Sequence, residues 1–283
     1  MFKNKKLKKF IKSLIPPVFL MLYAKCRRSA WGYNGTYVSF SEAEQHADGY
    51  DSPEIIKKVV ESTQKVLSKE AVFERDSVLF YTEEHNYDLI FSLYRVALQQ
   101  GRLHVLDFGG ALGSTFRQHL KLLKPAIKDL SWNIVEQDCF LKAAENIDFE
   151  EELHFFKNID EVMENTEIDV ILFSSVLQYL ENPSEIIEKA GNIRYIIVDR
   201  HPEFSARTES LFTVQNISEP IYNASYPLKI WGKSELQKTL SKTHSIVSEW
   251  EVKSDHTQYL EDNEKTKNKI KMTGMLLEKR CTQ

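Results

Sequence analysis

The stretch LHVLDFGGALGSTF, Leu103 to Phe116, decides the fold. It opens as a mostly apolar run of strand length, continues through Gly109, Gly110 and Gly113, and then takes on a helical pattern. A strand, a glycine-rich turn and a helix in this order bring backbone N–H groups to the carboxyl end of the strand, which is how many folds hold a nucleotide.

The chain alternates between strands and helices on the carboxyl side of this turn. The first five apolar runs are short and separated by connections of helix length, which predicts a parallel sheet covered on both faces. The last two are joined by a hydrophilic loop, which predicts an antiparallel pair at the sheet edge. The sequence therefore favours a doubly wound α/β sheet of seven strands: Leu103–Phe108, Trp132–Glu136, Leu153–Phe156, Val170–Ser174, Tyr195–Asp199, Ile246–Val252 and Ile270–Leu277.

The region before the turn, residues 29–102, is predicted to be a helical cap. Ser41 with Glu44 forms a capping-box pattern, Asp51-Ser52-Pro53 starts a helix that reaches about Ser68, and a further helix places Leu89, Leu93, Val96 and Ala97 on one face before Gly101. The aromatic segment Trp31 to Phe40 is predicted to form a loop and a short strand. This segment either fills a groove or lines a substrate site.

Length and composition fit one large domain with appendages. The chain has 283 residues, of which 42% are hydrophobic and 28% charged. Its cysteines, Cys26, Cys139 and Cys281, are odd in number and match no metal-ligand spacing. We therefore expect no disulfide framework, no metal site and a reducing compartment.

The net charge of −4 is unevenly distributed. Residues 1–28 hold nine basic residues and no acid, which leaves 28 basic residues against 41 acidic ones in the rest of the chain. An acidic body of this kind excludes a broad nucleic-acid surface, so no nucleic-acid partner is expected.

The basic tail, residues 1–28, also has an amphipathic pattern. Leu7, Phe10, Ile11, Leu14 and Ile15 share one helix face, and lysines occupy most of the rest. The apolar run from 14 to 24 is too short to span a bilayer and contains two prolines. A secretory signal is the competing interpretation, but the basic residues at 25, 27 and 28 oppose translocation. The pattern favours a cytoplasmic protein attached peripherally to the inner face of a bacterial plasma membrane, with a solvated basic tail as the alternative.

The register of the turn discriminates between cofactors. Its glycines do not fit G-x-G-x-x-G, the dinucleotide fingerprint. Read as Gly109-x-Ala111-x-Gly113 with Asp107 at the acidic position, the turn resembles the looser acidic-x-Gly-x-Gly-x-Gly loop of S-adenosylmethionine-dependent methyltransferases. The extra methyl of Ala111 is compatible with S-adenosylmethionine because that ligand has no phosphates to cradle.

Two further features agree with this cofactor. Glu136 follows Gly109 by 27 residues and closes the next strand, where its carboxylate can accept hydrogen bonds from both ribose hydroxyls. The segment after the fourth strand, SSVLQYLENP, resembles the stretch that borders the methionine end of the cofactor in these enzymes. Its polar residues, predicted to face the ligand together with Gly110 of the turn, are Ser174, Ser175 and Gln178.

The resemblance extends over most of residues 31–280. The motifs GYNGTYVSFSEAEQHADGYDSPEII, LDFGGALGS, IVEQD, SSVLQYLENP, IIVDRHP and NASYPLKIW, in this order, are similar to a family of class I S-adenosylmethionine-dependent methyltransferases associated with bacterial cell-surface polysaccharide biosynthesis. The resemblance implies a Rossmann-like methyltransferase domain over residues 103–283 and S-adenosylmethionine as cofactor. The acceptor in that family is poorly defined.

Candidate catalytic residues follow the fifth strand in the segment VDRHP. His201 has the intrinsic pKa range of a general base, Asp199 can orient it, and Arg200 can hold an anionic sugar or phosphate. A capping role for Asp199 and a local ion pair for Arg200 are the structural alternatives. Three aromatic residues that follow this segment are candidates for substrate binding, because aromatic rings stack on sugar rings. Packing in the core is the alternative role for these residues, which are Tyr222, Tyr226 and Trp231.

Three functions stay open at this point. The first is O-methylation of a glycan or lipid-linked sugar precursor. The second is an NAD-dependent sugar-modifying enzyme, which the turn register and the absence of a Tyr-x-x-x-Lys pair after the fourth strand disfavour. The third is a binding protein that keeps the fold without turnover.

Removing residues 1–28 is expected to release the chain from anionic membranes. Each lysine near an anionic surface contributes up to about 1 kcal/mol of binding free energy, and the apolar face adds to it. Co-sedimentation with phosphatidylserine vesicles measures this, with neutral vesicles as the control. Equal sedimentation of the shortened and full chains would contradict a membrane role for the tail.

Overall fold

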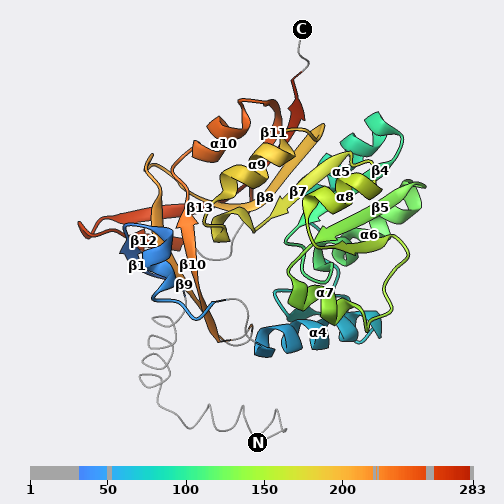
Figure 1. Cartoon of the computed structure of the whole chain (residues 1–283), viewed down its shortest axis with the longest axis horizontal. Helices are drawn as coiled ribbons and strands as arrows, with labels where there is room; N and C mark the ends of the chain where they lie inside the picture. Colours follow the sequence, from blue (N-terminus) through green and yellow to red (C-terminus); the bar gives the residue numbers. More distant parts are fainter. Residues whose placement is uncertain (1–31, 50–52, 219–220, 222, 253–257, 281–283) are drawn as a thin grey trace, which may run out of the picture.

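The computed structural model describes residues 32–49, 53–218, 221, 223–252 and 258–280 (Figure 1). The basic tail, with its predicted membrane-binding face, lies outside the described residues, as do the predicted helix cap at 51–52 and the predicted substrate contact Tyr222. Within the described ranges, no helix is both long and apolar enough to cross a membrane.

A mixed eight-stranded sheet forms the centre of the molecule. The strand order is β11-β13-β8-β7-β4-β5-β6, and β12 pairs with β13 beside this path. The neighbouring strands β8, β7, β4, β5 and β6 are parallel to one another. Strand β13 runs antiparallel to β8, β11 and β12. The strands are β4 (Leu103–Phe108), β5 (Leu130–Val135), β6 (Leu153–Phe156), β7 (Val170–Ser174), β8 (Tyr195–Phe204), β11 (His244–Val252), β12 (Gln258–Glu261) and β13 (Lys267–Lys279).

This arrangement confirms the predicted α/β class with a mixed central sheet. The antiparallel pair of β11 and β13 is present, and β11 occupies the edge because β13 also pairs with β8. The strand β12 is additional to the predicted seven. It lies in the hydrophilic loop, for which no strand was predicted.

The two faces of the sheet bury two separate cores because side chains alternate along each strand. On β7, Val170 and Leu172 face α5 (Tyr87–Gln100) and α6 (Ser114–Ala126). On the same strand, Ile171 and Phe173 face the opposite core. The helices over that second core are α8 (Ile159–Asn165), α9 (Pro183–Ala190) and α10 (Glu235–Leu240).

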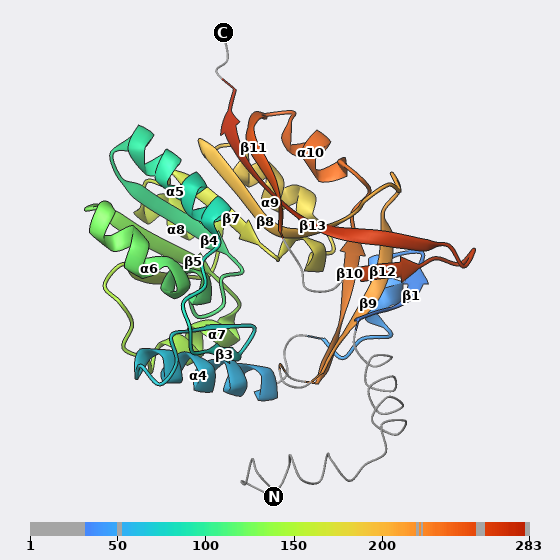
Figure 2. The ribbon, with the colours of Figure 1, turned by 180° about the vertical axis from the view of Figure 1, so that it is seen from behind.

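A second, three-stranded antiparallel sheet lies beside the first (Figure 2). Its strands are β1 (Gly32–Tyr37), β9 (Leu211–Ile217) and β10 (Ala224–Ile230), in the order β1-β9-β10. A cluster that includes Phe204 of β8, Leu228 of β10 and Ile270 of β13 joins the two sheets. A short strand was predicted near β1, whereas no strand was predicted at β9 or β10.

Residues 32–102 contain strands as well as helices. Helix α3 (Phe40–Glu44) is capped by Ser39, whose Oγ accepts a hydrogen bond from the Glu42 N–H at 3.1 Å, so the predicted cap at Ser41 is wrong by two residues. Helix α4 (Pro53–Leu67) matches its predicted range and packs on α7 (Asp138–Ala144). The short hairpin of β2 (Phe73–Arg75) and β3 (Val78–Phe80) was not predicted.

Helix α5 is the element of this region that its sequence specifies most fully. Asn86 caps its first turn, since the Asn86 Oδ1 accepts a hydrogen bond from the Leu89 N–H at 3.2 Å. Gly101 ends it in the left-handed conformation with φ of 75°. The predicted apolar face is buried against β4 and β8, and this packing fixes where the capping Asn86 lies relative to the central sheet.

Replacing Leu93 with alanine is expected to lower the free energy of unfolding by about 2–5 kcal/mol, because the side chain is fully buried and leaves a cavity. Leu98 is on the same helix but is 85% exposed, so Leu98→Ala should change the same quantity by less than about 0.5 kcal/mol. Urea unfolding of both variants measures the difference. Similar losses in the two variants would contradict the described packing of α5.

Candidate active site

The glycine turn leaves the carboxyl end of β4 in a left-handed path. Gly109 has φ of 72°, Ala111 of 48° and Gly113 of 87°. A side chain at Gly109 would put Cβ 2.6 Å from Cγ2 of Val176, so only glycine fits there. The turn closes through a 3.0 Å hydrogen bond from the Gly113 N–H to the Gly110 carbonyl oxygen.

Ala111 adopts a conformation that costs a non-glycine residue about 1 kcal/mol. Its side chain packs against an apolar cluster that contains Ile55 and Val59 of α4 and Phe140 of α7. This packing offsets the backbone cost, and it gives a physical reason for an alanine in the middle of the turn.

Glu136 reaches the turn from the end of the neighbouring strand β5, as the sequence predicted. Its Oε1 accepts a hydrogen bond from the Ala111 N–H at 3.0 Å, and its Oε2 accepts one from the Gln137 N–H at 2.8 Å. Burial raises the pKa of this carboxyl, and the two backbone hydrogen bonds oppose the rise. The carboxylate keeps further lone pairs for a hydroxylated ligand at this edge.

Asp107 lies beneath the turn and is buried. Its Oδ2 accepts a hydrogen bond from the Trp132 Nε1–H at 3.0 Å. Burial raises the pKa of Asp107 to about 7, and the charge of Glu136 adds to the rise. The side chain therefore supports the turn from below.

The segment after β7 sits at the same edge. Ser174 Oγ accepts a hydrogen bond from Arg200 Nη2 at 3.0 Å and donates one to Asp199 Oδ2 at 3.3 Å. Ser175 Oγ accepts a hydrogen bond from Gln178 Nε2 at 3.0 Å. Gln178 is buried, and its Oε1 has no hydrogen-bond partner among the described residues, so it is available to a ligand donor.

Asp199 collects donors from four elements. Besides Ser174 of β7, its carboxylate accepts hydrogen bonds from Asn86 Nδ2 at 2.9 Å and from Trp250 Nε1 of β11 at 3.4 Å, and it pairs with Arg200 Nε at 3.4 Å. The side chain is 2% exposed. A buried carboxylate needs such partners, so this group fixes how α5, β7, β8 and β11 meet.

A β-bulge at Asp199 and Arg200 separates His201 from this group. Val198 pairs with Met275 and His201 with Thr273, so two residues of β8 oppose the single residue Gly274 of β13. Arg200 takes a left-handed φ of 52° in this bulge. Because the bulge inserts one residue, His201 does not share the face of Asp199.

His201 instead packs on the opposite face, with its ring centroid 5.3 Å from that of Trp231. It is 1% exposed, and burial with the charge of Lys229 lowers its pKa to about 3. A general base works best with a pKa near the working pH, so this environment argues against the predicted base role. That role stays a prediction.

The two described aromatic candidates are buried. Trp231 is 3% exposed, and the Lys229 ammonium lies 3.9 Å from the centroid of its ring. Tyr226 of β10 belongs to the cluster that covers Ala111, and its ring meets that of Tyr179 edge to face at 6.0 Å. Their predicted contact with a substrate is untested, and both pack as core residues here.

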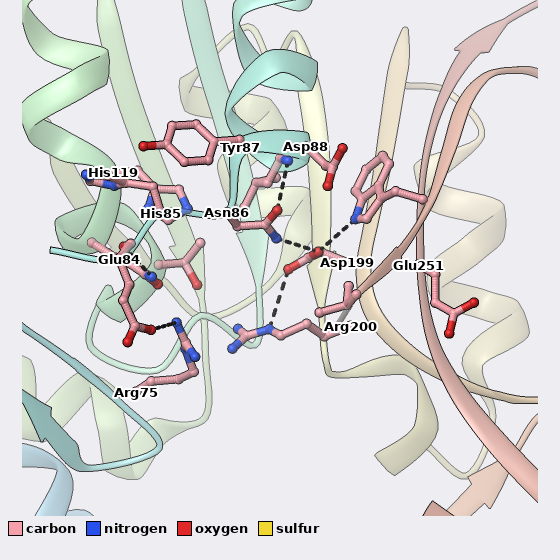
Figure 3. Close-up of a pocket in the computed structure, with 15 residues that line it drawn as sticks. Arg75, Glu84, His85, Asn86, Tyr87, Asp88, His119, Asp199, Arg200 and Glu251 are labelled. Carbon is pink, nitrogen blue, oxygen red and sulfur yellow. Dashed lines mark hydrogen bonds and ion pairs between the residues drawn. The ribbon is translucent and has the colours of Figure 1, made fainter. Parts of the chain in front are cut away.

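A cavity of about 350 Å³ opens beside Asp199 and Arg200 on the α5 and α6 side of the sheet (Figure 3). Its lining comes from the start of α5, the first turns of α6, the β2–β3 hairpin and the end of β11. The side chains that line it are mostly polar and include Arg75, Glu84, His85, Asn86, Gln118, His119 and Trp250.

Several of these lining residues were not candidates in the sequence. Asn86 carried a signal, because it precedes a helix pattern as a cap would, but nothing in the chain links it to Asp199 over 113 positions. Arg75 and Trp250 come from strands that are far apart in the sequence, and no pattern in the residues around them indicated a functional site. The cavity therefore depends on tertiary packing.

Comparison with known proteins gives fold neighbours of low similarity. No family model matches the chain, and no curated protein matches it. The N-terminal domain of EvdMO1, crystallised in the presence of SAH and D-fucose, aligns with a TM-score of 0.45 and 13% identity over 82% of this chain and 98% of its own.

Two other methyltransferase structures align similarly. A SAM-dependent methyltransferase from Methanosarcina mazei has a TM-score of 0.43 and 15% identity over 71% of this chain and 100% of its own. The N-methyltransferase NodS from Bradyrhizobium japonicum, in complex with S-adenosyl-L-homocysteine, has a TM-score of 0.41 and 12% identity over 78% and 99%. All three TM-scores are below 0.5, so the site is interpreted from its own residues.

The unfolding free energy of Asp107→Asn is expected to increase relative to that of the wild type as the pH rises. The folded-state pKa of about 7 lies above the ordinary value of 3.8, so the contribution of Asp107 to the unfolding free energy is full below pH 3.8 and is lost as the pH rises through about 7. Asparagine can still accept the Trp132 hydrogen bond. Urea unfolding at pH 5 and pH 8 measures the change.

The exposed Asp148 gives the matched control, since Asp148→Asn should leave the pH dependence of the wild type unchanged. If the stability difference between Asp107→Asn and the wild type were the same at both pH values, the burial of a titrating Asp107 would be contradicted.

Proposed function

We propose that this chain is an S-adenosylmethionine-dependent methyltransferase that methylates oxygen on a cell-surface glycan or a lipid-linked sugar precursor. The observation that carries the proposal is the contact of Glu136 Oε1 with the Ala111 N–H at 3.0 Å. This contact puts a carboxylate from one parallel strand against a glycine turn from the next, at the edge where open α/β sheets hold nucleosides.

The residues at this edge fit the cofactor. Glu136 can accept hydrogen bonds from ribose hydroxyls, and the turn from Gly109 to Gly113 offers its backbone because its one bulky side chain, Leu112, is buried in an apolar cluster. Gln178, which follows β7 at this edge, has a buried Oε1 without a hydrogen-bond partner in the described part of the chain. When bound, S-adenosylmethionine supplies an electrophilic methyl group on a sulfonium.

The cavity beside Asp199 would orient the methyl acceptor relative to the cofactor. In-line displacement depends chiefly on orientation, so fixed polar groups are what such a cavity must supply. The fixed groups here are Asn86, Trp250 and Arg200, each held by the Asp199 carboxylate. A polar lining of this kind suits a hydroxylated acceptor such as a sugar.

A hydroxyl acceptor also has to lose a proton. Among the residues that line the cavity, the imidazoles of His85 and His119 are able to accept one. Burial lowers the pKa of His119 to about 4, so the criterion that argues against His201 argues against His119 as well, and His85 is the candidate base. Because His201 faces the other core, we propose that the base comes from this cavity.

The cellular setting is part of the proposal. A lipid-linked sugar precursor lies at the inner face of the bacterial plasma membrane, and the nine basic residues of the tail would bring the chain there. The tail lies outside the described residues, so its sequence alone supports this step.

Calorimetric titration with S-adenosylmethionine, S-adenosylhomocysteine and NAD tests the cofactor. The two sulfur compounds should bind and NAD should not. Glu136→Gln should weaken their binding by about 10- to 100-fold, since hydrogen bonds to a charged group contribute about 1.5–3 kcal/mol. Glu145→Gln, at an exposed position, is the matched control.

Saturable binding of NAD without S-adenosylhomocysteine would contradict the proposed cofactor. Transfer of a labelled methyl group into extracted polysaccharide precursors tests the reaction itself. Binding of the cofactor without transfer to any fraction of that pool would favour a binding protein over an enzyme.

A further inference from the structure

Two guanidinium groups meet on one side of the cavity beside Asp199. Arg75 comes from β2, and Arg200 comes from the bulge in β8. Figure 3 shows the two groups next to each other. Burial is the main cause of the lowered pKa of Arg75, and the positive charge of Arg200 on the same side of the cavity lowers it further.

Most of the donors of this pair are unused. The Arg75 guanidinium makes a 3.7 Å ion pair with Glu84 and no side-chain hydrogen bond within the described residues. Arg200 donates a single hydrogen bond, to Ser174 Oγ, besides its ion pair with Asp199. Each guanidinium carries five N–H donors, so the pair can bind a planar or tetrahedral oxyanion through several hydrogen bonds.

Both arginines are held in place before any ligand arrives. The Arg75 guanidinium lies over the rings of Phe73 and Phe80, at 5.5 and 5.3 Å from their centroids, and those rings stack on each other at 4.5 Å. The turn of this hairpin is closed by Glu74, whose Oε2 accepts a hydrogen bond from the Ser77 N–H at 3.0 Å. Such preorganisation favours binding because little side-chain freedom is lost.

The carboxylates of the cavity do not compete for this role. Asp199 is already occupied by four donors, and the Glu84 side chain is 52% exposed beside Arg75. Asp88 and Glu251, which also line the cavity, are exposed, so a cationic acceptor would find no unpartnered buried carboxylate among the lining residues. His85, with a side chain 9% exposed, adds a buried Nδ1 that has no hydrogen-bond partner in the described part of the chain.

We infer that Arg75 and Arg200 form an oxyanion-binding subsite that holds a carboxylate or phosphate group of the methyl acceptor. The acceptor would thus be an acidic or phosphorylated sugar and not a neutral one. The assignment of this anion to the acceptor rests on the proposed function, whereas the subsite itself rests on the two arginines and the cavity they line.

Calorimetric titration of the full chain with glucuronate, glucose 1-phosphate and glucose, at constant ionic strength, tests the subsite. The charged probes should bind saturably and glucose should not. Whether the carboxylate or the phosphate probe binds more tightly identifies the anion. Arg75→Gln should weaken binding of the preferred probe at least tenfold, and Arg75→Lys should weaken it less, because lysine keeps the charge but not the forked donors.

Arg95→Gln is the matched control, since Arg95 is a half-exposed arginine on α5 outside this cavity, and it should bind the probe as the wild type does. Thermal unfolding checks that the variants are folded, and Arg75→Lys decides the outcome if Arg75→Gln is not. Equal binding of glucose and the charged probes, or wild-type binding by both Arg75 variants, would overturn the inference.

Titration with S-adenosylhomocysteine separates this inference from the proposed function. Cofactor binding without anion binding would overturn the subsite and leave the methyltransferase proposal standing. Anion binding that depends on Arg75, without cofactor binding, would keep the subsite and remove the proposed reaction.

Discussion

The site depends on one buried carboxylate, that of Asp199. It lies at the end of the parallel part of β8 and receives donors from α5, β7, β11 and its own neighbour Arg200. An uncompensated charge at 2% exposure would cost several kcal/mol, so the elements that supply these donors must come together when the chain folds. The cavity beside Asp199 is the space that remains between them. Its shape is therefore a consequence of satisfying this carboxylate.

The bulge in β8 decides which side chains reach that cavity. A regular strand would place Asp199 and His201 on one face, because side chains alternate with a period of two. The inserted residue moves His201 to the other core, beside Trp231, and lets Arg200 turn toward the cavity. Opposite the bulge stands Gly274, where a Cβ would lie 2.1 Å from the Trp250 indole. The absence of a side chain there lets Trp250 cross β13 and reach Asp199.

A second constraint acts at the glycine turn. Glu136 holds the Ala111 N–H, and Ala111 in turn packs under α4 and α7. The left-handed backbone of Ala111 is thus stabilised from both sides, by a hydrogen bond and by apolar packing. The turn and the cavity share the carboxyl edge of the sheet and are linked through the end of β7, where Ser174 donates a hydrogen bond to Asp199 and Val176 lies against Gly109. A nucleoside ligand and a polar acceptor can therefore meet at a single edge.

The local elements and the sheet edge that fits the cofactor could be predicted from the residues alone. The hydrophobic period and the positions of the glycines predicted β4, β6 and β7 at their observed bounds, and the spacing of Glu136 from the turn predicted that its carboxylate lies at the tip of the neighbouring strand. These features are local or depend on neighbouring parallel strands, whose carboxyl ends meet at one edge. Only the tertiary structure decided the second sheet, the bulge and the joining of Asn86, Arg75 and Trp250 around Asp199. A bulge depends on pairing with a strand that is distant in the sequence, and the hydrogen-bond donors of a buried carboxylate also come from distant residues. Neither feature therefore produces a periodic pattern in the nearby sequence.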